Sequence, residues 1–462
     1  MKHDTGKIPY RAATFLLFLI LLMALLSLSG CAASSESQST EGDAQSGQSK
    51  QSAQAADDGQ TRIIVATDLH YLAESLMTAP EKVKATCEAS DGKLTEYSPQ
   101  IVETFCNQVI EEGPDALVLA GDLTFNGEIV SLRDLQKALQ KVEKAGIPVL
   151  VIPGNHDIES RYAYSFKPGE IAPANNISRT DFRLIMERFG YSEAVSRDKD
   201  SFSYASDVDD HVRLIFLDVN GDSRPDHRQG TLTDGAMQWL ETQLEDAAES
   251  GRTVITVSHQ NLLRQNDFLY EGFVMDNGKK IASLLHEYGV RCHLSGHSHL
   301  QNQAVKKFHA KKDSAGNETS ADTADNETAS GQPLQDQITD ICTGVLTGCT
   351  LNYGLLTVEE DGTFHYEIQH VNDPELQELA LARGEKCARN QINGLLDMYD
   401  SFSAKERKQM ADFAVKVNLD YFSGDLTAEK IFSYLKDPAL KLWMDEVLQD
   451  DYWTQYIHSM LH

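Results

Sequence analysis

Residues 149–157 read VLVIPGNHD, a short apolar run followed at once by glycine and three polar side chains. The run is continuous rather than alternating, which is typical of a strand buried on both faces of a sheet. Asn155, His156 and Asp157 therefore follow the end of a strand, where open α/β sheets place their functional side chains. The same arrangement occurs at four other places, and together they predict both the fold and the chemistry.

Polar side chains that can bind a metal ion follow these four further apolar runs. They are Asp68 and His70, Asp122, His259, and finally His297 with His299 in the sequence Gly296-His297-Ser298-His299. With Asn155 the chain carries seven nitrogen and oxygen donors in five places. Each motif arises by chance on its own, but all five in the same setting indicate one site that holds two adjacent metal ions.

Helical patterns alternate with the apolar runs. One begins at Ser98-Pro99, a cap followed by proline, and another covers about 128–145 with leucines on one face. Alternating strands and helices predict a layered α/β domain, which we place at residues 61–370. Insertions at 71–97 and 160–200 follow two of the site motifs, so they are candidates for substrate selection.

The C-terminal part of the chain has a different pattern. Residues of about 311–336 are polar and without periodicity, and we expect a disordered surface loop there. After His370 the strand pattern stops, and helix starts follow at Asp373-Pro374, Ser403, Thr427 and Asp437-Pro438. Residues 373–462 are therefore expected to form a smaller all-α domain, whose aromatic side chains belong to its core.

The first thirty residues have the pattern of a secretory signal. A basic start precedes an apolar run, which ends at Leu28-Ser29-Gly30-Cys31. This ending resembles the bacterial lipobox, which implies a lipoprotein signal peptide at 1–30 and lipid attached to Cys31. An ordinary N-terminal membrane anchor is the alternative. Residues 31–60 are small and polar, which predicts a flexible tether. Both alternatives place the catalytic part outside the cytoplasm, at the bacterial cell membrane.

The composition restricts the possible partners. The chain has 41 Lys and Arg against 70 Asp and Glu, a formal net charge of −29. Broad nucleic-acid binding is therefore not expected, because duplex-binding proteins carry a basic surface. A small phosphoester substrate would be drawn by bound cations. None of the seven cysteines stands in a CxxC spacing, so the sequence predicts no thiolate metal site. We predict no disulfide pairing. The sequence also assigns no oligomeric state.

The five motifs, in this order, resemble the calcineurin-like metallophosphoesterase superfamily over residues 62–370. The resemblance implies a four-layer αββα sandwich. It also implies that the first metal is bound by Asp68, His70 and His299, the second metal by Asn155, His259 and His297, and both metals by a bridging Asp122. By the same resemblance His156 is the catalytic histidine, and Asp157 is its expected orienting partner. Gln260 departs from the family pattern, because many relatives have His or Tyr after the single ligand histidine.

The donor set supports the same interpretation on physical grounds. Carboxylate, imidazole and amide without thiolate suit two divalent ions such as Mn²⁺, Fe or Zn²⁺. Two such ions about 3.5–4 Å apart stabilise the attacking and leaving oxygens of an in-line displacement. A metal-bound hydroxide is then the expected nucleophile. His156 is expected to protonate the departing alkoxide, which contributes roughly 10²–10⁴-fold in rate.

A finer resemblance concerns the substrate. The sequence 121–128, the long insertion after His70 and the helical C-terminal domain are similar to exported bacterial phosphodiesterases. The implied activity is hydrolysis of 3′,5′-cyclic nucleotides or similar small diesters. A phosphomonoesterase or nucleotidase and a cell-envelope phosphoester hydrolase remain alternatives, because motif spacing does not separate them. A surface lipoprotein that only binds a partner is the least favoured interpretation, since no ligand is missing.

Overall fold

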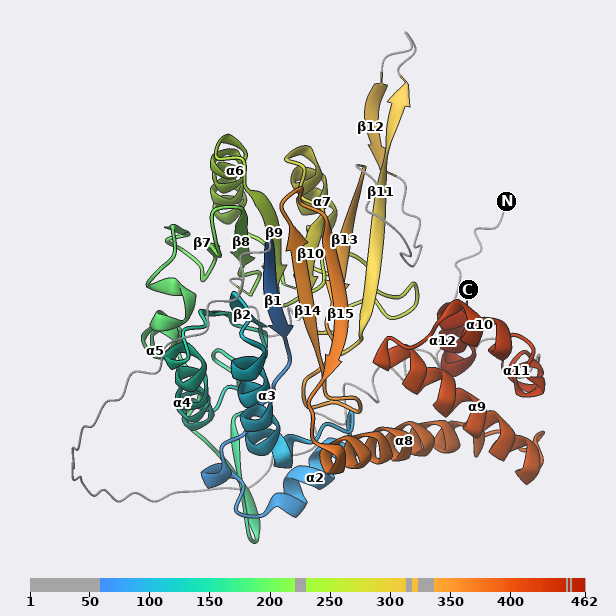
Figure 1. Ribbon diagram of the computed structural model, residues 1–462. Coiled ribbons are helices and arrows are strands. Elements are labelled where there is room, and N and C mark those ends of the chain that lie inside the picture. Colours follow the sequence, from blue (N-terminus) through green and yellow to red (C-terminus); the bar gives the residue numbers. More distant parts are fainter. Residues whose placement is uncertain are drawn as a thin grey trace, which may run out of the picture.

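The structure is a computed structural model, and it describes residues 59–220, 230–312, 318–322, 336–445, 448 and 451–461 (Figure 1). The expected signal peptide with Cys31, and nearly all of the expected tether, lie outside these residues. Among the helices that the structure describes, none combines the length and the apolar character that a membrane crossing needs.

One sheet has five strands in the order β15–β14–β1–β2–β3. Its members are β1 (Gln60–Ala66), β2 (Ala116–Ala120), β3 (Val149–Ile152), β14 (Asn352–Glu359) and β15 (Phe364–His370). β1, β2 and β3 run parallel, as their continuous apolar sequences predict; β14 pairs antiparallel with β1, and β15 pairs antiparallel with β14. The carboxyl ends of the three parallel strands therefore lie at the same edge of the sheet.

The second sheet has eight strands in the order β12–β11–β13–β10–β9–β8–β7–β6. Its members are β6 (Ser196–Arg197), β7 (Tyr204–Asp207), β8 (Val212–Leu217), β9 (Thr253–Ser258), β10 (Cys292–Ser295), β11 (Asn302–Lys312), β12 (Glu318–Asp322) and β13 (Gln337–Cys342). β8, β9, β10 and β13 form its parallel centre. β9 and β10 thus end at a common edge, as β1 to β3 do in the other sheet.

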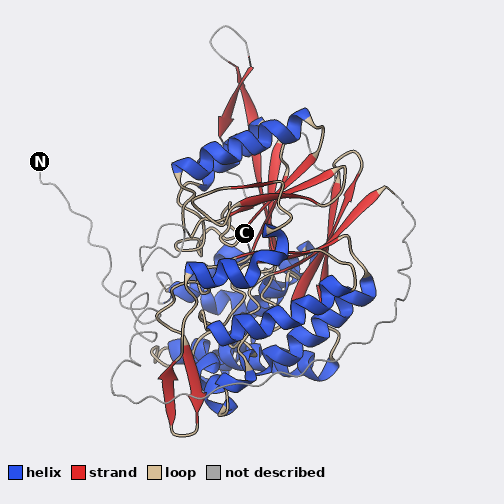
Figure 2. Cartoon of the chain, turned by 90° about the vertical axis from the view of Figure 1, so that its left-hand side faces the viewer, coloured by secondary structure: helices blue, strands red, loops and turns tan. Residues whose placement is uncertain are grey.

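Helices cover the outer faces of both sheets. α3 (Ser98–Glu112) and α4 (Ile129–Lys144) share one hydrophobic core with the five-stranded sheet and the inner face of the second sheet. α6 (Asp234–Glu249) and α7 (Gly278–Glu287) pack with the outer face of the second sheet in a separate core. Helices therefore lie on both sides of the strands (Figure 2). The predicted four-layer αββα sandwich is confirmed.

The two insertions form small elements around one end of the sandwich. Residues 71–97 contain η1 (Glu74–Leu76), α2 (Pro80–Glu88) and η2 (Thr95–Tyr97). Residues 160–200 contain β4 (Tyr164–Lys167), β5 (Glu170–Pro173), α5 (Arg179–Met186), the turn η3 (Glu187–Tyr191) and β6. β4 and β5 pair as a hairpin that projects from the body of the molecule (Figure 2).

Part of the expected disordered loop at 311–336 is a strand. β12 lies in it and pairs antiparallel with the end of β11. No sequence pattern indicates this strand, because backbone hydrogen bonds along a sheet edge need no apolar alternation. The rest of this loop lies outside the described residues, apart from the ends of the flanking strands.

The C-terminal region is helical. It consists of α8 (Pro374–Leu396), α9 (Ala404–Ser423), α10 (Ala428–Tyr434), α11 (Pro438–Trp443) and α12 (Tyr452–Leu461). The first four helices begin at the predicted caps, since Asp373, Ser403, Thr427 and Asp437 each accept a hydrogen bond from the first turn. α12 was not predicted, although Oδ1 of Asp451 accepts a hydrogen bond from the backbone of Trp453 at 2.9 Å.

Helix α8 connects two cores. Near its start, Leu376 and Ala380 pack into the core of the sandwich. From Ala388 onward its buried side chains pack with α9, α11 and α12, around the fully buried Trp443. One continuous helix therefore ties the helical region to the sandwich.

Candidate metal centre

The predicted ligands meet where the strands of the two sheets end. Asp68 and His70 follow β1, Asp122 follows β2, and Asn155 follows β3. His259 follows β9 in the other sheet, and the pair His297 and His299 follows β10. Among the residues that the structure describes, three groups of side chains have ligand atoms close enough to hold a metal ion: Asp68, His70 and His299; His70, Asp122 and His156; and Asp122, His259 and His297. Asp122 and His70 each belong to two groups, so the groups form one continuous cluster.

The first group surrounds Oδ1 of Asp68. This oxygen lies 3.3 Å from Nε2 of His299 and 3.7 Å from Nε2 of His70. The Nε2 atoms of the two histidines lie 3.2 Å apart. These three atoms point into a common space, in the arrangement that the resemblance assigns to the first metal.

The proposed ligands of the second metal surround Nε2 of His259. This nitrogen lies 3.0 Å from Oδ1 of Asn155 and 3.3 Å from Oδ2 of Asp122. The same Oδ2 atom lies 3.9 Å from Nε2 of His70, on the side of the first group. Asp122 therefore lies between the two groups, where a bridging carboxylate is expected.

Backbone carbonyls fix the orientation of two of the histidine rings. Nδ1 of His259 lies 2.9 Å from the carbonyl of Ala120, and Nε2 of His297 lies 2.8 Å from the carbonyl of Gly272. A ring nitrogen that donates to a carbonyl leaves the other nitrogen as a lone-pair ligand. His259 can thus offer Nε2 and His297 can offer Nδ1 to a metal ion.

Residues at the strand ends adopt strained backbone conformations. Five of the predicted ligands have positive φ values: Asp68 (53°), His70 (42°), Asp122 (47°), His297 (66°) and His299 (59°). This region is uncommon for residues with a side chain, and such strain concentrates at functional sites. Neighbouring glycines let the strand ends pack closely, because a Cβ atom on Gly154 would collide with Asp122 and one on Gly296 with Thr67.

Burial and charge set the protonation of the cluster. Burial lowers the pKa of His297 to about 3 and that of His70 well below its usual value. Burial lowers the pKa of His259, but the negative charge of Asp122 has the larger opposite effect, and the pKa rises to about 9. Burial alone would raise the pKa of Asp68 and Asp122, yet the nearby imidazoles lower it for both. The carboxylates are therefore ionised, which is the form that binds metal ions.

The residues present fit a pair of divalent cations. Oδ1 of Asp68 is buried and has no hydrogen-bond partner among the described residues. Nε2 of His70 and Nε2 of His299 face each other beside it, and two lone pairs in that position repel unless a proton or a cation lies between them. Buried polar atoms without partners are costly, so their convergence indicates a cation site.

His156 lies beside the cluster, held by Asn126. Its Nε2 is 3.9 Å from Oδ2 of Asp122, and its Nδ1 is 2.8 Å from Oδ1 of Asn126. The expected orienting partner, Asp157, instead accepts hydrogen bonds from the backbones of Leu123, Thr124 and Gly154. Asp157 thus joins the two loops that carry Asp122 and Asn155, and Asn126 takes the place beside His156 that was expected for Asp157.

We expect Asn126→Ala to lower kcat by roughly tenfold to a hundredfold, the usual cost of losing a group that orients a functional histidine. The ring of His156 would lose the contact that fixes its Nδ1, while the metal-binding groups would stay intact. Steady-state kinetics and metal analysis test this result, with Asn176→Ala, an exposed asparagine of the 160–200 insertion, as the control. Unchanged kcat for Asn126→Ala would remove its orienting role.

Asn126 could have been found in the sequence, because it lies four residues after Asp122 in the same loop. Gln260 has a structural role: it is buried, and its Nε2 donates to Oδ1 of Asn220 at 2.7 Å. The carbonyl of Gly272, which orients the ring of His297, could not be predicted, because every residue has the same backbone carbonyl.

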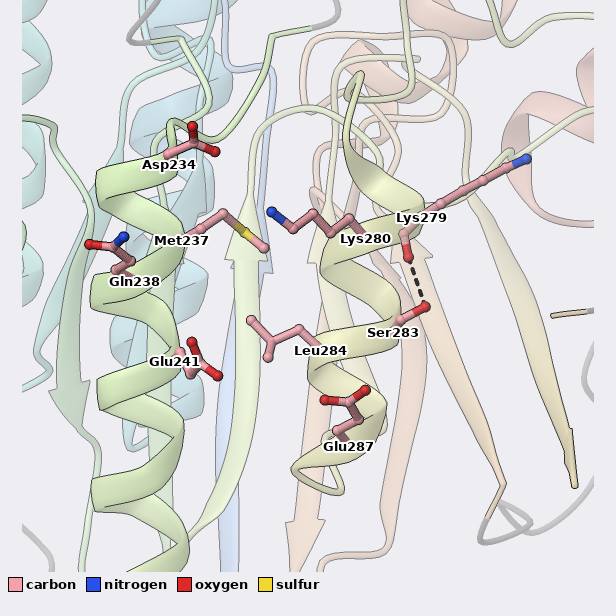
Figure 3. A pocket seen from close by; sticks show the side chains of 9 residues that line it. All are labelled: Asp234, Met237, Gln238, Glu241, Lys279, Lys280, Ser283, Leu284 and Glu287. Atoms are coloured by element: carbon pink, nitrogen blue, oxygen red, sulfur yellow. Dashed lines mark hydrogen bonds between the residues drawn. The ribbon is translucent and has the colours of Figure 1, made fainter. Parts of the chain in front are cut away.

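An open groove of about 610 Å³ lies between α6 and α7, on the outer side of the second sheet (Figure 3). Acidic and basic side chains line it together, among them Glu241, Glu287 and Lys280. It contains none of the predicted ligands and is lined by residues of α6 and α7 alone. We therefore assign it no part in the chemistry of the metal centre.

Two family models match the chain. The model of calcineurin-like phosphoesterases matches residues 61–301, and that of the C-terminal domain of cyclic nucleotide phosphodiesterase matches residues 380–462. The first match covers about half of the chain and contains all of the predicted metal ligands.

Curated relatives are similar over part of their length. A glycerophosphodiester phosphodiesterase GpdQ of Enterobacter lignolyticus is 27% identical over 191 residues, which are 41% of this chain and 58% of that protein. A probable cyclic nucleotide phosphodiesterase of Rhodococcus erythropolis is 29% identical over 197 residues, which are 42% of this chain and 54% of that protein. The chain thus spans little more than half the length of these two relatives.

Solved structures resemble the sandwich at low sequence identity. A dimetal phosphatase from Danio rerio has a TM-score of 0.44 and 14% identity, and the match covers 68% of this chain and 97% of that one. The purple acid phosphatase PPD1 of yellow lupin has a TM-score of 0.39 and 17% identity, with 68% and 52% covered.

Proposed function

This chain belongs to the calcineurin-like phosphoesterase family, and we propose that within it the chain hydrolyses small phosphodiesters, in particular 3′,5′-cyclic nucleotides. Its coarser activity follows from the family and from its relatives: it is a hydrolase that acts on phosphoester bonds. Members of the family use two divalent metal ions. When bound, such ions activate the attacking water and neutralise the phosphoryl oxygens.

The proposed ligands are the side chains that converge at the strand ends, with Asn155 included and His156 left out. Asp68, His70 and His299 would hold one ion, and Asn155, His259 and His297 the other. Asp122 would be shared by the two ions, because its Oδ2 faces both His70 and His259. Asp157 would keep the loops after β2 and β3 in register through its hydrogen bonds to both.

His156 is the proposed proton donor to the leaving oxygen. Its Nδ1–H donates to Oδ1 of Asn126, which leaves Nε2 as the nitrogen that faces Asp122 and the substrate space. A doubly protonated ring can give the Nε2 proton to the departing alkoxide and still keep the bond to Asn126.

The observation that carries the cyclic-nucleotide proposal is the C-terminal match, together with where that region lies. The backbone of Gln301, two residues after His299, donates to the carbonyl of Phe422 at the end of α9. The hydroxyl of Tyr421 accepts from Asn266 at 2.9 Å, in the loop that leads to Gly272. The region that resembles cyclic nucleotide phosphodiesterases thus borders both loops next to the predicted ligands.

A second candidate is hydrolysis of glycerophosphodiesters, which the name of one relative favours. Both candidates are small diesters, and both suit a strongly acidic chain better than a nucleic-acid polymer does.

The test measures hydrolysis by the purified full chain with added Mn²⁺, before and after treatment with a chelator. We expect bis-p-nitrophenyl phosphate to be cleaved at least about tenfold faster than p-nitrophenyl phosphate, which corresponds to about 1.4 kcal/mol of transition-state discrimination. Hydrolysis of 3′,5′-cAMP should also disappear with the chelator and return with Mn²⁺.

Each comparison has an outcome that counts against the proposal. A preference for the monoester would favour the phosphatase or nucleotidase alternative. Cleavage of glycerophosphocholine without cleavage of 3′,5′-cAMP would leave the diester chemistry and replace the substrate. Activity that survives complete removal of metal would contradict the two-metal site.

A further inference from the structure

The loop of residues 89–94, between α2 and η2, brings a carboxylate and a cation to the metal centre. Oδ2 of Asp91 lies 2.6 Å from the ammonium of Lys93 and 3.5 Å from Nδ1 of His299. The Lys93 ammonium therefore lies close to the His299 ring, with Asp91 between them. No sequence motif marked either residue.

Asp91 completes the surroundings of His299. The Nε2 of this histidine faces Oδ1 of Asp68 at 3.3 Å, inside the first ligand group, and its Nδ1 faces Asp91 on the other side. A histidine that binds a metal commonly donates its second N–H to a carboxylate, which fixes the ring and strengthens the ligand. Asp91 occupies the position of such a partner.

Lys93 is a buried cation in the wall of the site. Only 8% of the residue is exposed, and its buried charge is paired with Asp91. Its partner Asp91 lies 3.5 Å from Nδ1 of His299, so the ammonium stands beside the first ligand group, near the space where an anionic phosphoryl group would lie.

Helix α8 of the C-terminal region holds this loop. The guanidinium of Arg383 donates to the carbonyl of Lys93 at 3.3 Å and to Glu96 at 2.6 Å, and Arg383 is only 4% exposed. Gly92 has a φ of 79°, and a Cβ atom there would lie 3.0 Å from the sulfur of Cys387. The loop therefore fits against α8 closely enough that the helix fixes its position.

We propose that the 89–94 loop is part of the phosphodiesterase site, with Asp91 as the positioning residue for His299, Lys93 as a binding group for a phosphoryl oxygen of the substrate, and Arg383 as the residue through which α8 holds them. The inference rests on the proposed function for the substrate role of Lys93, but the role of Asp91 depends only on metal binding. The C-terminal region is then a working part of the site.

The first measurement is the affinity for Mn²⁺ by titration calorimetry of the full chain. Asp91→Asn should weaken one of two Mn²⁺ sites by about tenfold to a hundredfold, as loss of an outer-shell carboxylate does. Asp91 is exposed and its neighbours are polar, so this variant should fold as the parent does. Two unchanged Mn²⁺ affinities would overturn the role of Asp91, whatever the enzyme hydrolyses.

The second measurement is binding of inorganic phosphate to the Mn²⁺-loaded protein, alongside KM for bis-p-nitrophenyl phosphate. Lys93→Met should raise the Kd for phosphate and the KM for bis-p-nitrophenyl phosphate by about tenfold each. The change in kcat should be smaller, and two Mn²⁺ ions should still bind. Lys93→Arg should restore part of the phosphate affinity because it keeps the charge. Unchanged phosphate binding in Lys93→Met would overturn the role of Lys93.

The link to α8 is tested with Arg383→Lys and Arg383→Met against Arg389→Met. Arg389 lies on the same helix and pairs with Asp412 and Glu385, away from the loop. Both Arg383 variants should weaken Mn²⁺ and phosphate binding in the direction of the loop variants, and Arg389→Met should weaken neither. Arg383→Lys that folds as the parent does and binds both probes normally would overturn the link.

If the parent hydrolyses no diester but Asp91→Asn loses Mn²⁺ affinity, the proposed function fails and the metal part of this inference stands.

Discussion

Asp122→Asn is expected to abolish hydrolysis, because it removes the charge that the proposed site shares between two metal ions. Removing a single stabilising hydrogen-bond donor from an active site already costs roughly 10²–10³-fold in rate, so we expect the catalytic efficiency to fall by at least about a thousandfold. The physical reason lies in one atom. Oδ2 lies 3.3 Å from Nε2 of His259 and 3.9 Å from Nε2 of both His70 and His156. An amide nitrogen in its place would repel a cation.

The rest of the site should survive this substitution. Oδ1 of Asp122 accepts a hydrogen bond from the backbone of His156 at 2.8 Å, and the amide oxygen of asparagine can accept the same bond. Metal analysis should show weaker binding of both ions, while thermal unfolding without metal should change little. Asp198→Asn is the matched control, because Asp198 is buried and lies outside the ligand groups. Normal metal content in Asp122→Asn would disprove the bridging role.

His156→Gln is expected to lower kcat by roughly 10²–10⁴-fold, the usual contribution of a general acid. Metal content should stay near that of the parent, because His156 is not among the proposed ligands of either ion. Its side chain is 33% exposed, so the substitution should cost little stability. The effect should be largest for an alkyl leaving group, which needs a proton, and smallest for p-nitrophenolate, which does not.

The same substitution at an exposed histidine supplies the control. His365→Gln on β15 changes the same chemical group far from the ligands and should leave kcat unchanged. Equal losses for the alkyl and the p-nitrophenyl substrates in His156→Gln would contradict a proton-donor role and leave His156 as a substrate-binding group. Full activity on the alkyl substrate would remove it from the mechanism.

Much of the fold could be predicted from local sequence alone. Short apolar runs such as residues 149–152 have only one favourable use in a large protein, as strands buried on both faces. Their order with the helices then predicts the layers, and caps such as Asp373 and Ser403 mark where helices begin. β12 was missed because it forms through backbone pairing, and the start of α12 was missed because no proline follows its cap, Asp451.

The sandwich and the convergence of the proposed ligands were both predictable from the order of residues, because each of these side chains follows a strand end and parallel strands bring their ends together. The surroundings of that set became visible only in the folded chain. Asn126 replaces Asp157 beside His156, and Arg383, almost three hundred residues from Lys93, holds the loop that faces His299. Contacts of this kind depend on side-chain direction and on packing between distant segments, and neither leaves a periodic pattern in the sequence.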